Sequence, residues 1–186
     1  LAKFISKERL IKKVNLIVRT SPAEEPSRFE SLIKKYPFII WNFPDWNISR
    51  EDHQEAWTQR VPTIEDLNDL KSLLKYCDLC INVLSTITLD AFIYNKPVIN
   101  PVFGNENNEW FDDQKFLKYK HLSKLVDSNS TDIVKNEKEY LNSINNVLNG
   151  NDVKQKERAD FITLQIGGKL ENTSKRIASI LSLCND

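Results

Sequence analysis

The sequence predicts an α/β protein in which a doubly wound parallel sheet is followed by a helical C-terminal tail. From about residue 14 to 128, short β-branched or apolar runs alternate with amphipathic helical segments. Several of these runs are apolar throughout, which is typical of parallel strands covered by helices on both faces. From about 136 to 184 the pattern becomes helical only.

The first half of the predicted sheet contains two clear strands and one helix. "KVNLIVR" (13–19) and "PFIIWNF" (37–43) are rich in the residues that favour strands. Between them "SRFESLIKKY" (27–36) has helical spacing, with Ser27 as a plausible N-cap. A polar stretch follows, in which "AWTQRV" (56–61) is a candidate third strand.

The second half begins with a helix that carries an explicit start signal. Thr63 opens a T-x-x-D pattern before "TIEDLNDLKSLLKYC", in which four leucines form one apolar stripe. Further strands are predicted at 78–84, 96–103 and 121–128, with a helix at 85–95 between the first two. The helices of the tail are predicted at about 137–149, 152–162 and 171–183.

Composition limits the class of protein and where it can act. The 186 residues are 40% apolar and suffice for one domain with a sizeable core. Basic and acidic residues balance at 26 each, so no overall field recruits nucleic acid or an anionic membrane. No apolar run approaches the ~20 residues of a transmembrane segment. We therefore expect a cytoplasmic protein, either free or peripheral to a membrane.

Several common sites lack their residues. The four glycines form neither G-x-G-x-x-G nor a phosphate-binding Walker loop. Cys77 and Cys80 form a C-x-x-C, but the first thiol ends a helix instead of beginning one, so both are expected to be structural. His53 and His121 show no metal-ligand spacing, and we predict no metal.

The stretch "CINVLSTITLD" contains the strongest candidate site. Ser85 and Thr86 lie where a predicted strand runs into a helix, at the edge of a parallel sheet where ligands bind. Their hydroxyls and the backbone N–H groups could bind a phosphate. Asp90 shares a helix face with Thr86 and is placed to accept hydrogen bonds from ribose hydroxyls. The alternative is structural, because Ser and Thr are also good helix caps and the helix dipole favours an early Asp.

Residues 64–101, "IEDLNDLKSLLKYCDLCINVLSTITLDAFIYNKPVINP", resemble the C-terminal nucleotide-binding domain of GT-B glycosyltransferases and their relatives, the CDP-glycerol glycerophosphotransferases and UDP-GlcNAc 2-epimerases. The resemblance is looser over about 14–150. It implies a Rossmann-like fold, phosphate binding by Ser85 and Thr86, and ribose binding by Asp90. "LIVRTSP" resembles the family's first strand end, which implies that Arg19 neutralises a phosphate, although the family's following histidine is missing. The alternative is that Arg19 is a solvated cation at the strand end.

The resemblance implies the donor-binding half of a glycosyltransferase or polyol-phosphate transferase that acts in polysaccharide synthesis. The substrate would be a nucleotide-diphosphate sugar, and no separate cofactor is expected. Because the chain begins at Leu1 and contains no Met, we expect a fragment that lacks an N-terminal acceptor domain and is inactive alone. No catalytic base can be assigned. The absent domain would cover exposed rings, for which Trp46, Trp57, Phe103 and Trp110 are candidates, and the alternative is that these rings pack onto their own domain. A non-catalytic nucleotide-binding or scaffolding domain is the alternative.

Overall fold

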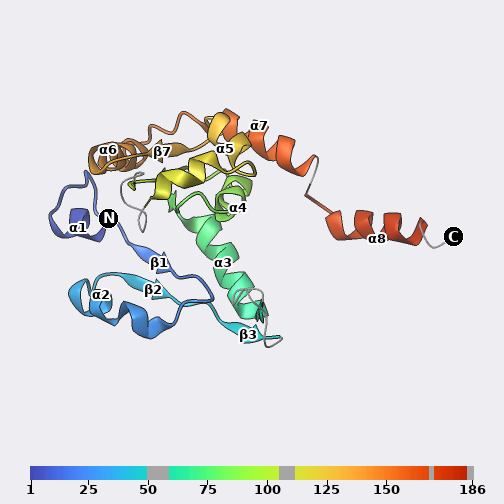
Figure 1. The fold of residues 1–186 in the computed structure, drawn as a ribbon, viewed down its shortest axis with the longest axis horizontal. Coiled ribbons are helices and arrows are strands. Elements are labelled where there is room, and N and C mark those ends of the chain that lie inside the picture. The colour runs from blue at the N-terminus through green and yellow to red at the C-terminus, as the bar shows by residue number, and fades with distance from the viewer. Residues whose placement is uncertain (50–58, 105–111, 168–169, 184–186) are drawn as a thin grey trace. The chain divides into compact units, whose positions relative to one another are not determined.

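The computed structural model describes residues 1–49, 59–104, 112–167 and 170–183 (Figure 1). The chain divides into two compact units. Unit 1 contains Leu1–Leu79 and Glu137–Asn151, and unit 2 contains Cys80–Asn136 and Asp152–Asp186. Both mix helices with strands, so the α/β class is confirmed. Since two compact units can belong to one domain, the prediction of a single domain stays a prediction.

Two small sheets form the strand part of unit 1. Strands β1 (Ile17–Arg19) and β2 (Ile40–Asn42) pair in parallel, with Arg19 opposite Asn42. They lie inside the predicted strands and are shorter. Strands β3 (Trp46–Ile48) and β4 (Arg60–Pro62) pair antiparallel. β4 falls at the end of the predicted 56–61 strand, whose first residues lie outside the described ranges, and β3 was not predicted.

The helices of unit 1 follow the sequence signals where these are strong. The Oγ1 atom of Thr63 accepts the backbone N–H of Asp66 at 3.1 Å and caps α3 (Ile64–Tyr76), as predicted. The segment predicted as one helix at 27–36 is a 3₁₀ turn, η1 (Pro26–Phe29), followed by α2 (Glu30–Lys35). Ser27 therefore lies inside the turn and is not a cap, because Pro26 occupies the first position, where its fixed φ favours a helical start.

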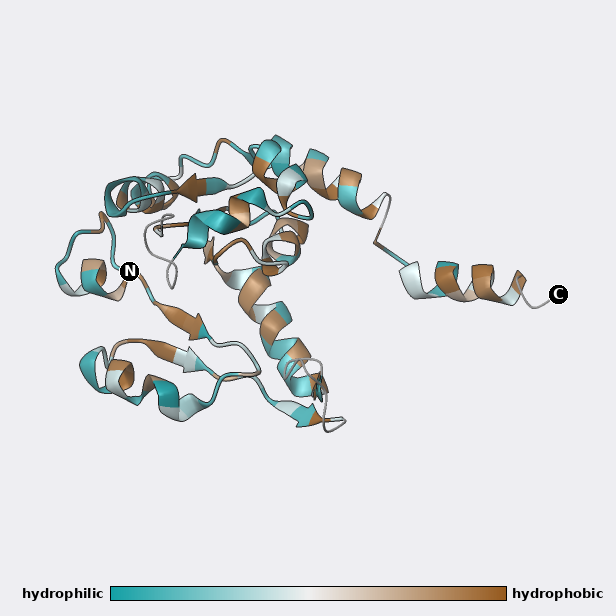
Figure 2. Cartoon of the chain, viewed as in Figure 1, coloured by the Kyte–Doolittle hydropathy of each residue, from teal (hydrophilic) through white to brown (hydrophobic). Residues whose placement is uncertain are grey.

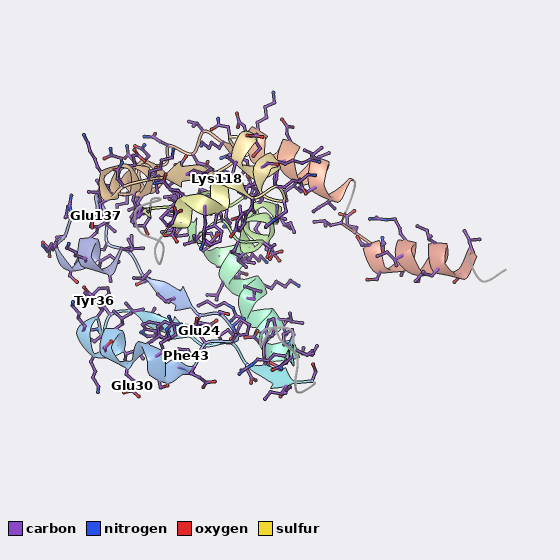
Figure 3. The ribbon with its side chains drawn as sticks, viewed as in Figure 1. Glu24, Glu30, Tyr36, Phe43, Lys118 and Glu137 are labelled. Atoms are coloured by element: carbon purple, nitrogen blue, oxygen red, sulfur yellow. The ribbon has the colours of Figure 1, made fainter. Side chains whose placement is uncertain are left out.

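Aromatic contacts build much of the interior of unit 1. Phe4 of α1 (Ala2–Ser6) lies 6.0 Å, ring centre to ring centre, from Tyr140 of α6 (Glu137–Leu148), and both are buried. Near β2, the rings of Trp41 and Phe43 stack at 5.7 Å, and Phe29 packs against both. Phe43 is labelled in Figure 3. These ring pairs join segments that the two short sheets alone would hold weakly.

Unit 2 contains a parallel sheet of three strands. Its order is β5 (Cys80–Ile81), β6 (Val98–Pro101) and β7 (Asp132–Val134), and β6 at the centre is the most deeply buried. Among the described residues the strands thus form three sheets, of which this is the largest. The parallel arrangement agrees with the predicted class, whereas a doubly wound sheet stays a prediction.

The strand predicted at 121–128 is wrong. That segment contains helix α5 (Ser123–Asp127), which follows a 3₁₀ helix, η4 (Asp113–Lys118), and the last strand is β7. A short apolar run cannot by itself distinguish a strand from a buried helix turn. Leu122 and Leu125 are both buried and lie three residues apart, which is the spacing of one helix face.

The helices expected in the C-terminal part are confirmed as α6, α7 (Gln155–Ile166) and α8 (Thr173–Leu183). Within unit 2, α7 packs on α4 (Ile87–Ile93), where the rings of Phe92 and Phe161 meet edge to face at 6.2 Å. In the described ranges, no helix is long and apolar enough to cross a membrane.

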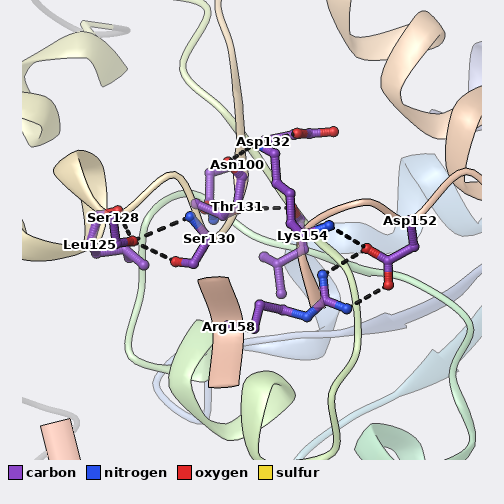
Figure 4. Close-up of polar contacts among 10 residues, drawn as sticks. Asn100, Leu125, Ser128, Ser130, Thr131, Asp132, Asp152, Lys154 and Arg158 are labelled. Atoms are coloured by element: carbon purple, nitrogen blue, oxygen red, sulfur yellow. Dashed lines mark hydrogen bonds and ion pairs between the residues drawn. The ribbon is translucent and has the colours of Figure 1, made fainter. Parts of the chain in front are cut away.

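Polar contacts hold the amino-terminal edge of the unit 2 sheet (Figure 4). The buried guanidinium of Arg158 donates to both carboxylate oxygens of Asp152 and to the side chain and backbone carbonyl of Asn95. Lys154 pairs with Asp132 at 2.8 Å and donates to the carbonyl oxygen of Thr131 at 2.7 Å. These contacts fix the start of α7 to the turns before β6 and β7, so we assign them a structural role.

Candidate functional site

The corner between β5 and α4, residues 82–86, follows the carboxyl end of a parallel strand. Leu84 in its middle is buried and has a φ of 38°. A bulky residue in this left-handed region is strained by on the order of 1–3 kcal/mol and persists only when its surroundings impose the conformation. The corner is therefore held by specific contacts.

The side chain of Asn82 provides these contacts. Its Oδ1 atom accepts the backbone N–H of Ser85 at 2.9 Å, and the Ser85 hydroxyl lies 3.3 Å away. The hydroxyl of Thr88 donates to the same oxygen at 3.1 Å, and so does the Nδ2 atom of Asn100 at 3.1 Å. One amide oxygen thus ties the corner to the first turn of α4 and to β6.

The network continues through the sheet. Asn100 is fully buried, and its Nδ2 atom also donates to the backbone carbonyl of Asn82 at 2.8 Å. The hydroxyl of Thr131 lies 2.7 Å from the Oδ1 atom of Asn100. Buried polar groups that are paired in this way rigidify and specify one arrangement. Sequence reasoning missed this network, for which the available signal was an asparagine in each of two predicted apolar strands.

Ser85 and Thr86 are both exposed, but their polar groups differ in availability. The N–H and hydroxyl of Ser85 point at Asn82. Thr86 is the N-cap residue of α4 and makes no side-chain capping bond. In the part of the chain that the structure describes, the backbone N–H groups of Thr86 and Ile87 have no acceptor. These donors could bind the oxygens of an anion, although residues 82–90 include no cation.

Asp90 lies one turn further along α4 and is half-buried. Burial raises the pKa of its carboxyl, and no described residue donates a hydrogen bond to it or pairs with its charge. A partly desolvated carboxylate without a protein partner is free to accept hydrogen bonds from a ligand, and carboxyl groups with a shifted pKa occur preferentially at functional sites. Thr86 and Asp90 therefore combine unused donors and an unused acceptor on one helix.

Arg19 belongs to unit 1, at the carboxyl end of β1. Its guanidinium donates to the Oδ1 atom of Asn42 and lies 2.6 Å from the buried carboxylate of Asp66. That carboxylate also accepts the Trp46 indole N–H at 2.7 Å and the Asp45 backbone N–H at 3.0 Å. The guanidinium therefore links β1, β2 and α3, and its predicted role toward a phosphate stays a prediction.

The two histidines and the aromatic rings named from the sequence are placed as follows. His121 is exposed and its ring lies 5.6 Å from that of Tyr119. Phe103 is exposed, whereas Trp46 is half-buried. His53, Trp57 and Trp110 lie outside the described residues. Within the described ranges, no group of three or more His, Cys, Asp or Glu side chains could hold a metal ion.

No protein-family model, curated protein or solved structure matches the chain. The resemblance to GT-B nucleotide-binding domains therefore stays a prediction.

Proposed function

We propose that the β5–α4 corner of unit 2 binds the nucleotide diphosphate of an activated sugar. In this proposal the chain is the donor-binding half of a glycosyltransferase or polyol-phosphate transferase with a Rossmann-like, doubly wound fold. Another domain would supply the acceptor site and the catalytic base. The Thr86 hydroxyl and the adjacent N–H groups would contact the phosphates, and Asp90 would accept hydrogen bonds from the ribose.

Asp90 is the observation that carries this proposal. A half-buried carboxylate loses hydration, and in this chain no described side chain replaces it. A ligand with adjacent hydroxyls would supply the missing hydrogen bonds. The exposed donors one turn earlier in the same helix suit a phosphate group, which accepts hydrogen bonds but donates few.

A purely structural corner, as in a scaffolding domain, is supported by a different observation. Both donors of Ser85 are directed at the Asn82 side chain, so the hydroxyl has an internal role without any ligand. In that case the corner would serve only to turn β5 into α4. The two functions differ in whether the chain binds nucleotides at all.

Calorimetric titration of the chain with UDP, CDP and GDP tests the proposal. We expect one of the three diphosphates to bind at a single site and the corresponding sugar nucleotide to bind at the same site in competition. If none of the three diphosphates and none of their sugar derivatives binds, the result favours the structural corner.

Replacing Asp90 with Ala is expected to weaken binding of that diphosphate by roughly 1 to 3 kcal/mol, the usual range for a hydrogen bond to a charged group. Asp160→Ala, which removes an exposed carboxylate from α7, is the matched control and should leave the affinity unchanged. Because the hydroxyls of the ligand favour the ionised carboxylate, affinity should also fall in acid as Asp90 becomes protonated, and the Ala variant should lack this component. Equal affinities for wild type and Asp90→Ala at neutral pH would exclude the ribose role.

A further inference from the structure

Helix α8 has an apolar face that is open to solvent. All of its residues, Thr173–Leu183, are exposed. Ile177, Ile180 and Leu181 follow the i, i+3, i+4 spacing of one helix face, and Leu183 lies three residues after Ile180, at the edge of that face. The exposed fractions of these four side chains lie between 53% and 77%. Figure 2 shows the hydrophobic residues along this helix. Three large aliphatic side chains on one face, with Leu183 at its edge, form a patch that indicates an interaction surface.

The opposite face is polar but its hydroxyls are satisfied within the helix. Lys175, Ser179 and Ser182 follow the i, i+4, i+7 spacing. The hydroxyl of Ser179 donates to the carbonyl oxygen of Lys175, and that of Ser182 to the carbonyl oxygen of Ala178, both at 2.9 Å. Such internal bonds lower the cost of moving the helix into a medium with less water.

The charges of α8 are of one sign. Lys175 and Arg176 lie in its first turn, and the segment 173–183 contains no Asp or Glu. This contrasts with the balanced charge of the whole chain, in which 26 basic and 26 acidic residues cancel. The helix therefore presents a local positive charge beside an aliphatic face, which complements a negatively charged apolar surface.

The large side chains on the apolar face of α8 are aliphatic: Ile177, Ile180 and Leu181. Such a face suits either a lipid surface or a groove in a protein, and the cations beside it favour the anionic lipid surface. Aliphatic side chains partition into the acyl boundary of a bilayer without needing a shaped pocket, and cations beside them bind anionic headgroups.

We propose that α8 is an interfacial anchor that binds anionic lipid bilayers, with Ile177, Ile180 and Leu181 in the acyl boundary and Lys175 and Arg176 at the headgroups. A single short helix gives reversible binding that weakens with salt. This inference is independent of nucleotide binding.

Cosedimentation of the whole chain with vesicles tests the anchor. Wild type is expected to bind vesicles of phosphatidylcholine and phosphatidylglycerol in equal parts more strongly than phosphatidylcholine alone. The double substitution Ile180→Gln with Leu181→Gln should lower affinity by about tenfold or more, because two aliphatic side chains are lost while helix propensity is kept. The matched control Leu164→Gln, which changes an equally exposed leucine on α7, should bind like wild type.

A second pair of variants isolates the charges. Lys175→Gln with Arg176→Gln should lower affinity for the anionic vesicles by roughly tenfold and leave binding to neutral vesicles unchanged. Circular dichroism should show wild-type helix content in all variants. The proposal is overturned if wild type binds neither vesicle, if the Ile180 and Leu181 variant binds like wild type, or if light scattering shows a dimer that only this variant abolishes.

Discussion

Replacing Arg158 with Met is expected to destabilise unit 2 by about 3 to 4 kcal/mol. Arg158 is 1% exposed, so its charge depends on protein partners in place of water. It donates to Asp152 at 2.8 Å from one guanidinium nitrogen, pairs with the second carboxylate oxygen from another, and binds Asn95 at 3.1 Å. Met fills a similar volume but removes the charged donors from that carboxylate, which keeps the Lys154 backbone N–H at 3.4 Å, and removes the guanidinium donors from Asn95.

Urea denaturation followed by circular dichroism measures this effect. Lys156→Met changes an exposed cation on the same helix and is expected to alter stability by at most about 0.5 kcal/mol. In a double-mutant cycle, Arg158→Met with Asp152→Asn should cost clearly less than the sum of the single substitutions, because the second change removes the charge that the first leaves unpaired. Additive losses would show that Arg158 acts by packing alone.

Replacing Asp66 with Asn is expected to destabilise unit 1 by about 2 to 3 kcal/mol at neutral pH. The buried carboxylate accepts hydrogen bonds from Arg19, Trp46 and the Asp45 backbone. An amide of the same shape has one oxygen fewer, and its NH₂ group would face a donor. Arg19 would also lose its ion-pair partner. Glu65→Gln, an exposed change in the same turn of α3, is the control and should cost at most about 0.5 kcal/mol.

The destabilisation caused by Asp66→Asn should depend on pH in a defined direction. Burial alone raises the pKa of Asp66, but the hydrogen bonds from Arg19, the Asp45 N–H and Trp46, together with the Arg19 charge, outweigh burial and hold the pKa below its usual value. The carboxylate therefore stabilises the fold above the unfolded pKa of about 3.9, and this contribution is lost as pH falls through the lower folded pKa. The stability difference between wild type and Asp66→Asn should thus be full at pH 7 and narrow in acid. A constant difference down to about pH 2 would contradict this assignment.

The sequence by itself determined the elements whose signals are local. Helix α3 begins where Thr63 and Asp66 predict a cap, because capping involves atoms only three residues apart. Strand β6 lies within its predicted range, and the C-terminal helices follow their apolar spacing. Ser85, Thr86 and Asp90 became candidate site residues in the same way, since a strand running into a helix is visible along the chain, and their role stays a prediction.

Only the tertiary structure decided features that join distant segments. The segment at 121–128 is a helix because Leu122 and Leu125 are buried together, which a short apolar run does not reveal. The partners of Asn82 lie up to 18 residues away, and Arg19 meets Asp66 across 47 residues. Pairing a buried polar group depends on which segments the fold brings together, and single residues with no repeating pattern carry no signal for that choice. The roles of Asn82 as the organiser of the corner and of Asp66 as the partner of Arg19 therefore emerge from three-dimensional contacts alone.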